Sequence, residues 1–394
     1  MPFSRTVILA AAAVLLLAIV AITVALCSKP ADSGSGSQEP ADTRTRISFV
    51  AVGDNLPDEY IGYYADAQLD EPLDETYDYR PIFAHIKPYI EAADLAYMKQ
   101  ETTVGGNVIG PKGYPSFNTT DEMADAVVDM GVDLVASASN HAYDWGLYDA
   151  LEHSLEVWES KPVAFTGTAV TAEQYYRIPM VERKGVTFAL LDYTYGLNWP
   201  DDLEISEYAV NLIDKDRIAA DVERAREEGA DVVLVAMHWG TENLMEADEE
   251  QLDLAQFLAD LDVDVVLGSH PHVIGPMAWV ENSDGSGHKT LVAYSLGNFL
   301  SDHETPGPRN ELEGMLNCDF VVENDGTITI ENVKWTPLVN HTNADRWNFA
   351  VYALKDYTAE LAAENPFLAE LDDPQEWFRT SSAEVVGPEF EQDV

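Results

Sequence analysis

Residues 263–273 read VDVVLGSHPHV, a short apolar run that ends in Gly-Ser and then in His-Pro-His. A run of Val and Leu this short, bounded by turn residues, is typical of a strand buried on both faces of its sheet. The proline between His270 and His272 restricts the loop that follows, so both imidazoles are carried on a constrained segment directly beyond the strand. We interpret this stretch as a buried strand of an α/β protein that brings two imidazoles to a metal site at the edge of a sheet.

The same pattern recurs along the chain. Further apolar runs predict strands at residues 47–53, 94–98, 133–138, 186–192, 232–238, 290–296 and 318–323. Amphipathic stretches predict helices at residues 121–130, 146–159, 214–228, 249–261 and 349–364. Asp325-Gly326 predicts the turn of a hairpin over residues 324–335. Buried strands that alternate with helices indicate the α/β fold class.

Polar side chains stand at the ends of most of these predicted strands. In open α/β sheets ligands bind beyond the carboxyl ends of the strands, so we expect these side chains to converge on one rim. They are Asp54, Glu101, Asn140, His141, His238, His270, His272 and Asn298. Two carboxylates, an amide and three imidazoles from this set are the ligands of a borderline divalent metal site, with room for two metals.

Each residue alone also has a plainer interpretation. His238 fits a hydrogen-bonded structural histidine, Asp54 fits the start of a turn, and YSLGNF at 294–299 fits a tight turn. The sequence ASNHAYDWG at 138–146 is more specific, because Asp144 follows His141 by three residues. A carboxylate at that spacing would orient the imidazole and raise its basicity, as general acid or base catalysis requires.

Composition limits the classes of partner. Seventy acidic residues stand against 22 basic ones, which gives a net charge of −48 and disfavours nucleic-acid binding. Solubility or adaptation to salt also accounts for such acidity. Cys27 and Cys318 are the only cysteines, so the chain has no disulfide framework and no cysteine-based zinc site. Any metal is therefore held by nitrogen and oxygen ligands.

The first 46 residues read as a membrane anchor and a tether. Residues 7–26, VILAAAAVLLLAIVAITVAL, are uncharged and long enough to cross a bilayer once, which places the rest of the chain outside the cytoplasm. Cleavage at Cys27 as a lipoprotein is the alternative, disfavoured by the large Leu26 before it. Residues 28–46 are rich in Gly, Ser and Pro and predict a flexible linker. A main domain at 47–340 and an acidic, partly helical extension at 341–394 follow.

Several motifs, in this order, carry a resemblance to a known family. They are SFVAVGDN, YMKQET, ASNHAYDWG, VAMHWGTE, VDVVLGSHPHVIGP and YSLGNF. Together they resemble the bacterial capsule-synthesis family of CapA type, associated with poly-gamma-glutamate biosynthesis and placed within the calcineurin-like metallophosphatase superfold. The resemblance covers roughly residues 47–340.

The resemblance implies a four-layer αββα sandwich, in which two mixed β-sheets are flanked by helices and a dinuclear-type metal centre lies on one rim. His141 would be the proton donor or transition-state stabiliser, assisted by Asp144. The implied metal ligands are Asp54, Glu101, Asn140, His238, His270 and His272.

The chain departs from the pattern of the superfold in its first motif. Asp54 is followed by Asn55 and Leu56 where an Asp-x-His motif is usual, and Asp58 occupies a place where relatives often carry histidine. Lys99 stands where asparagine is expected. These differences leave open whether a second metal is held. Lys99, Asn298 and Arg309 are candidate substrate-binding residues.

Two functions are compatible with these observations. The first is a membrane-tethered, extracytoplasmic metal-dependent hydrolase or transferase, in which metal-bound water or hydroxide attacks a phosphate ester or an amide-like carbonyl and His141 acts as acid or stabiliser. The resemblance implies poly-gamma-glutamate or another anionic envelope polymer as its substrate. The second is a non-catalytic subunit of a capsule synthesis or export complex that keeps the fold as a binding module. Manganese, iron and zinc remain equally compatible with the ligand set.

Overall fold

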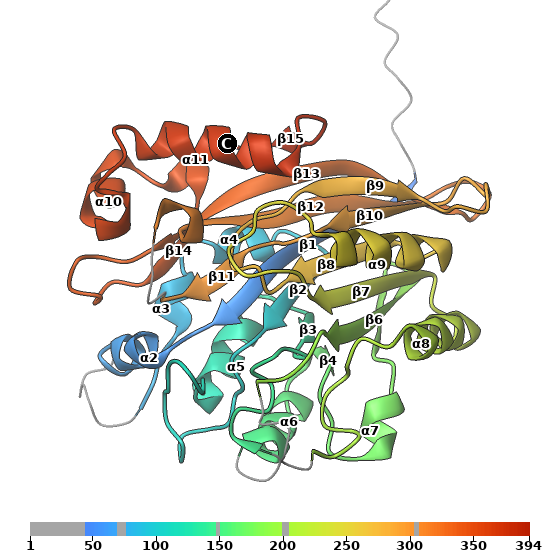
Figure 1. Ribbon diagram of the computed structural model, residues 1–394, viewed down its shortest axis with the longest axis horizontal. Helices are drawn as coiled ribbons and strands as arrows, with labels where there is room; N and C mark the ends of the chain where they lie inside the picture. The colour runs from blue at the N-terminus through green and yellow to red at the C-terminus, as the bar shows by residue number, and fades with distance from the viewer. Residues whose placement is uncertain (1–43, 69–75, 147–149, 199–204, 303–306) are drawn as a thin grey trace, which may run out of the picture. The chain divides into compact units, whose positions relative to one another are not determined.

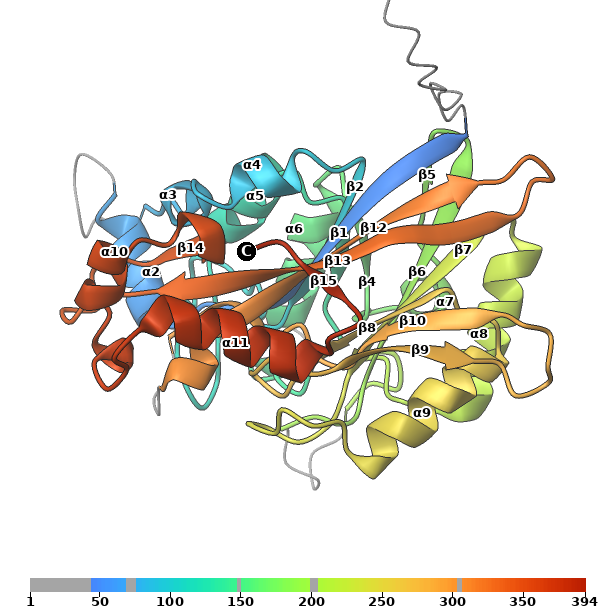
Figure 2. The same cartoon turned by 90° about the horizontal axis from the view of Figure 1, so that it is seen from above.

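Two β-sheets packed face to face carry the fold (Figures 1 and 2). The computed structural model describes residues 44–68, 76–146, 150–198, 205–302 and 307–394. The predicted membrane span at 7–26 and nearly all of the predicted linker lie outside the described residues. In the part of the chain that the structure describes, no helix combines the length and the apolar character needed to span a bilayer.

The first sheet has nine strands in the order β14-β13-β12-β1-β2-β3-β4, with β11 beside β1 and β15 beside β13. Its strands are β1 Thr45–Leu56, β2 Leu95–Gln100, β3 Leu134–Ala136, β4 Ala164–Thr166, β11 Asn298–Ser301, β12 Leu312–Val322, β13 Ile328–His341, β14 Ala350–Ala353 and β15 Glu391–Gln392. The central pairs β1–β2, β2–β3 and β3–β4 are parallel, whereas β12 pairs with β1 and β13 in antiparallel fashion. The sheet is therefore mixed.

The second sheet has six strands in the order β5-β6-β7-β8-β10-β9. They are β5 Met180–Arg183, β6 Val186–Thr194, β7 Val232–His238, β8 Val265–Ser269, β9 Met277–Glu281 and β10 Lys289–Ala293. The strands β6, β7, β8 and β10 run parallel, and the two edge strands are antiparallel to their neighbours. The predicted α/β class with two mixed sheets is confirmed.

Alternation along the strands explains how the sheets pack. On β1, Phe49 points into the space between the sheets, where its ring and that of Phe188 on β6 contact the ring of Phe320 at centroid distances of 5.7 and 5.0 Å. The neighbouring Val50 and Val52 point to the other side and join a separate buried cluster under helices. Successive strand residues face opposite sides, so β1 is apolar on both faces because both are covered.

Helices cover the outer side of each sheet. Helices α3, α5 and α6 pack on the first sheet, and α8 and α9 pack on the second (Figure 1). The α-helices are α2 Glu59–Asp66, α3 Arg80–Phe83, α4 Lys87–Ile90, α5 Asp121–Asp129, α6 Glu152–Glu159, α7 Ala172–Tyr176, α8 Lys215–Glu227, α9 Glu249–Asp260, α10 Ala359–Glu364 and α11 Pro374–Val386. Short 3₁₀ helices occupy Pro308–Asn310, Leu354–Asp356 and Pro366–Leu368.

The structure changes some predicted elements. The helix predicted at 349–364 is wrong in its first part, where residues 350–353 form strand β14 on β13. A 3₁₀ turn at Leu354–Asp356 follows, and the α-helix is confined to α10 at the end. The strand predicted at 133–138 ends at Ala136. The Ser137 amide still donates to Thr166 O of β4 at 2.9 Å, but the Ala138 amide donates to the side chain of Asp192, at Oδ2, at 2.6 Å. The chain therefore leaves the strand ladder just before Asn140.

Two glycines at the ends of β1 and β8 allow the backbone of another segment to lie in contact with theirs. A Cβ on Gly53 would lie 1.9 Å from Gly297 O, and one on Gly268 would lie 2.0 Å from Tyr294 O. The Asp54 amide donates to the same Gly297 oxygen at 3.0 Å. Only glycine fits at such approaches, so these residues fix the strand ends of β1 and β8 in place.

The chain beyond His341 continues the same compact unit. Strand β14 pairs with β13, β15 runs parallel to β13, and α11 lies along β13 (Figure 2). Phe378 of α11 is fully buried, with its ring 6.4 Å from that of Tyr357. The C-terminal segment therefore contributes to the core.

Candidate metal centre

Strands from both sheets end at one edge, and each brings a predicted ligand there. Asp54 lies in β1, Glu101 follows β2 and His238 ends β7. His238 Nδ1 is 3.8 Å from Asp54 Oδ1, and His238 Nε2 is 3.6 Å from Glu101 Oε1. One ligand atom from each lies within 4.8 Å of the other two, and all three side chains are buried. We call Asp54, Glu101 and His238 the inner triad.

Asn140 joins the inner triad from the loop beyond β3. Its Oδ1 lies 2.7 Å from His238 Nε2. The Asn140 backbone oxygen accepts from the Asn198 amide at 2.9 Å, which fixes the loop. The predicted amide ligand is thus in reach of the same point as the inner triad.

His270 and His272 lie on a strained loop. Their φ angles are 95° and 56°, in a region that side-chain-bearing residues rarely adopt. Such strain persists where the surroundings fix it, and it clusters at functional sites. Here Asp54 Oδ2 accepts from the His270 amide at 2.9 Å, and His272 Nδ1 lies 2.9 Å from Asn298 Oδ1.

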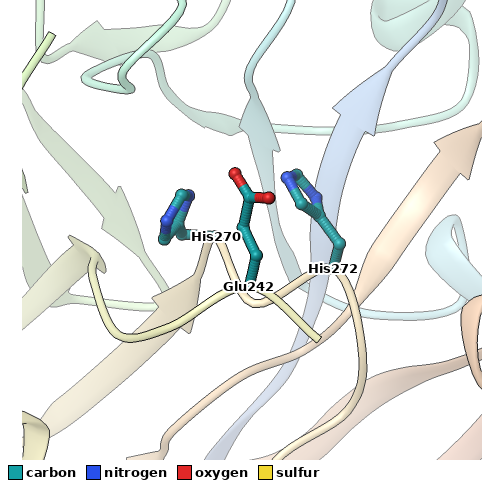
Figure 3. Close-up of side chains that lie close together, drawn as sticks. All are labelled: Glu242, His270 and His272. Atoms are coloured by element: carbon teal, nitrogen blue, oxygen red, sulfur yellow. The ribbon is translucent and has the colours of Figure 1, made fainter. Parts of the chain in front are cut away.

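A second group of side chains gathers around these two histidines. Glu242, His270 and His272 point toward one another (Figure 3), and one ligand atom from each lies within 4.8 Å of the others. Sequence patterns do not single out Glu242, because it lies in a loop beyond β7 and not at a strand end. Its signal is its place in the motif VAMHWGTE.

Buried atoms without partners test whether these residues suit a metal. Among the described residues, Asp54 Oδ1, both carboxylate oxygens of Glu101 and His270 Nδ1 are buried and make no hydrogen bond. Leaving one such atom unsatisfied costs about 1–3 kcal/mol, and more when the group is charged. All four atoms are metal-ligand atoms on one rim. The residues therefore fit a divalent cation with nitrogen and oxygen ligands.

Burial also determines the protonation of these groups. Desolvation raises the pKa of Asp54, and desolvation together with the nearby Asp54 charge raises the pKa of Glu101 well above its ordinary value. Desolvation and neighbouring imidazoles lower the pKa of His238 strongly and that of His270 to about 3. The histidines are therefore neutral, which is the form that binds metals.

His141 is held for a different task. Its Nδ1 lies 2.7 Å from Asp144 Oδ2, which also accepts from the Phe117 amide at 2.9 Å. The Phe117 ring meets the imidazole edge to face at a centroid distance of 4.7 Å. Nε2 lies 3.3 Å from Asn198 Nδ2. The carboxylate fixes the orientation of the ring and directs Nε2 away from Asp144.

A cavity of about 380 Å³ adjoins His141 and His272. Its charged residues include Arg346, whose Nε donates to Asp302 Oδ1 at 3.0 Å and whose guanidinium lies 4.1 Å from the centroid of the Tyr60 ring. The cavity is lined by Leu56, Asp58, Glu59, Tyr60, Gly113, Tyr114, Phe117, His141, Glu242, Asn243, His272, Ser301, Asp302 and Arg346. It is the space next to the metal-ligand candidates in which a substrate would lie.

The residues predicted to bind substrate have other places. Lys99 is fully buried between the sheets, with Nζ 2.6 Å from Asp192 Oδ1, so the prediction that it binds substrate does not fit. Asn298 is buried and holds His272, which makes it a positioning residue. Arg309 is exposed and does not line the cavity, where Arg346 supplies positive charge instead. Arg346 lies beyond the predicted main domain, which is why sequence patterns miss it.

The residues around the missing first-strand histidine have structural partners. Asn55 Nδ2 donates to Gln100 Oε1 at 2.9 Å. Asp58 caps helix α2, with Oδ1 accepting from the Tyr60 and Ile61 amides at 2.9 and 3.2 Å. Neither joins the inner triad, so the first motif supplies Asp54 alone.

The chain is similar in sequence to two bacterial CapA proteins and in structure to a phosphoesterase. The chain is 25% identical over 285 residues to "PGA biosynthesis protein CapA" of Bacillus subtilis (strain 168), covering 68% of each chain. It is 24% identical over 237 residues to "Capsule biosynthesis protein CapA" of Bacillus anthracis, covering 56% of this chain and 54% of that protein. Among solved structures, the calcineurin-like phosphoesterase YfkN from Bacillus subtilis is similar at 12% identity and a TM-score of 0.42, covering 86% of this chain and 98% of that one.

The family model described as "Bacterial capsule synthesis protein PGA_cap" matches residues 48–303. This range begins in β1 and contains all the residues of the inner triad, the His-Pro-His loop and the His141–Asp144 pair. The chain therefore belongs to the PGA_cap family of bacterial capsule synthesis proteins.

Proposed function

We propose that this protein is a metal-dependent hydrolase or transferase of capsule biosynthesis. The observation that carries the proposal is the convergence of buried, unpartnered ligand atoms of Asp54, Glu101 and His270 on one rim. The residues that would hold the metal are Asp54, Glu101, Asn140, His238, His270 and His272. A divalent cation supplies Lewis acidity at such a site and makes water a better nucleophile at neutral pH.

The chain's own residues would divide the remaining work. His141, held at Nδ1 by Asp144, presents Nε2 toward Asn198 beside the cavity and would donate a proton to the leaving group. Two contacts keep the His-Pro-His loop in place: buried Asn298 holds the His272 ring, and the Asp54 carboxylate accepts from the His270 amide. Phe117 covers the edge of the His141 ring and limits its contact with water.

The proposed substrate is an anionic envelope polymer such as poly-gamma-glutamate. Support comes from membership of a capsule synthesis family and from the relatives named for PGA and capsule biosynthesis. The cavity beside His141 offers Arg346 as a cation, set among the carboxylates of Asp58 and Asp302. An acidic polymer would therefore need cations to bridge it to the rest of this surface.

Metal content tests the proposal. The full chain, purified in mild detergent without chelators or a His tag, is expected to carry one or two equivalents of transition metal by elemental analysis. The double variant His270→Ala/His272→Ala is expected to carry none, because it removes two imidazoles from the rim. Absence of metal from the wild type, even after incubation with manganese, iron and zinc, would overturn the hydrolase and favour a non-catalytic binding subunit of a capsule assembly.

The proposed location is the cell membrane, with the main domain outside the cytoplasm and residues 7–26 as a single span. The uncharged run of that segment is the support. The full chain is expected to stay with membranes after alkaline carbonate washing, and a chain beginning at Arg44 is expected to be released. Release of the full chain by the wash would contradict the proposal that residues 7–26 span the membrane. An acylated Cys27, detected by mass analysis, would show that the protein is a lipoprotein instead.

A further inference from the structure

We propose that Glu242 is a metal ligand and that, with His270 and His272, it forms a second metal position outside the inner triad. This inference rests on the proposed function, because it extends the same metal centre. In each of two groups, three ligand atoms lie within 4.8 Å of one another. One group is Glu242 with the two loop histidines, and the other is the inner triad.

The backbone delivers Glu242 to this place. The Asn243 amide donates to Pro271 O at 2.7 Å, which joins the loop after β7 to the His-Pro-His loop. The Asn310 side chain then clamps both loops, since its Nδ2 donates to Asn243 Oδ1 at 3.1 Å and to His272 O at 3.2 Å. The backbone bond of Asn243 and the side chain of Asn310 therefore keep Glu242 beside the two histidines.

His270 gives an independent sign of a ligand. Its side chain is 4% exposed, and its Nδ1 is buried and has no hydrogen-bond partner within the described ranges. An imidazole nitrogen in that state lacks the contact that burial normally requires. A cation shared with Glu242 would satisfy it.

The ligand types suit the same class of metal as the inner triad. Two imidazoles and one carboxylate form a known three-ligand set for zinc and related ions, which leaves a fourth position open for water or substrate. Glu242 is exposed, and it lines the cavity together with His272, so a metal held by both would lie beside that cavity. An outer metal would therefore contact substrate directly.

Glu242 also compensates for the motif that the chain lacks. With Asn55 and Leu56 after Asp54, the first strand supplies one ligand where the superfold usually supplies two. The Glu242 carboxylate, in the loop beyond β7 of the second sheet, would take the place of the ligand that β1 of the first sheet does not supply. It also brings a carboxylate to a group that otherwise contains two imidazoles.

The test compares Glu242→Gln with Glu246→Gln in the full chain. Both changes remove one exposed carboxylate from the same loop, so they match in charge, but Glu246 is not in the cluster. Binding of Mn²⁺ and Zn²⁺ is measured by calorimetric titration and elemental analysis, and Co²⁺ is followed by its visible absorption.

Wild type and Glu246→Gln are expected to bind two ions, whereas Glu242→Gln is expected to keep one and to hold the second at least about tenfold more weakly. Its Co²⁺ spectrum is expected to lose the contribution of the second ion. Two equally held ions in Glu242→Gln would overturn the inference and leave the proposed function intact. A wild type with one ion would also overturn it, and a wild type with none would overturn both.

Discussion

Replacing His141 with alanine is expected to lower the turnover number, kcat, by about 10²–10⁴-fold, the range for losing a positioned general acid. The effect follows from the geometry, because Asp144 orients the ring through Nδ1 and leaves Nε2 as the nitrogen that would pass a proton to the leaving group. Metal content is expected to stay at the wild-type level, since His141 does not belong to either group of ligand atoms.

The measurement uses bis(4-nitrophenyl) phosphate as a phosphodiester and gamma-glutamyl 4-nitroanilide as a gamma-glutamyl amide. His153→Ala is the matched control, because His153 Nε2 lies 2.7 Å from Asp121 Oδ1 in a partly exposed pair, and neither residue lines the cavity. The control is expected to keep its rate. A His141→Ala enzyme with normal metal content and more than half of the wild-type kcat would remove His141 from the catalytic role.

Replacing Lys99 with methionine is expected to lower the free energy of unfolding by about 3–5 kcal/mol, the cost of leaving one charge of a buried pair without its partner. Lys99 and Asp192 are both fully buried and 2.6 Å apart, one on each sheet. Lys99 Nζ also donates to Ala138 O at 2.5 Å, and Asp192 Oδ2 accepts from the Ala138 amide. The pair thus fixes the start of the loop that carries Asn140.

Urea unfolding of the full chain measures this change. The double variant Lys99→Met/Asp192→Asn is expected to recover most of the loss, because it leaves no unpaired charge and asparagine can still accept from the Ala138 amide. Lys184→Met is the control, since the Lys184–Asp94 pair is partly exposed and worth about 0–1 kcal/mol. Equal stabilities for the Lys99 and Lys184 variants would show that the buried pair does not stabilise the packing of the sheets.

The metal-ligand candidates could be predicted because they depend on a rule that is local in sequence. A ligand that stands at the end of a buried strand, such as His238 or His270, is marked by the apolar run before it. The two mixed sheets followed from the family resemblance, and the α/β class followed from the apolar runs. The sequence therefore indicated the edge of the sheets at which the candidate site lies.

The residues that escaped prediction depend on contacts between distant segments. Lys99 looked like a cation open to substrate, and only the packing of the second sheet reveals Asp192, 93 positions away, as its partner. The position of Glu242 beside the histidines depends on the hydrogen bond from the Asn243 amide to Pro271 O, which the sequence does not reveal. Residues 350–353 became a strand because β13 offers them a partner, a tertiary effect that overrides helix propensity.

The position of β1 in the middle of its sheet has a consequence for how the chain is made. β1 pairs with β2 on one side and with β12 on the other. Arg44, directly before β1, donates to the side chain of Glu323, 279 positions later. During synthesis from the amino terminus, β1 therefore waits as an open edge until β12 emerges, which exposes it to pairing with other chains. An expressed fragment cut at 303, where the family match ends, would keep that edge open permanently. Fragments intended for study need to extend through β13.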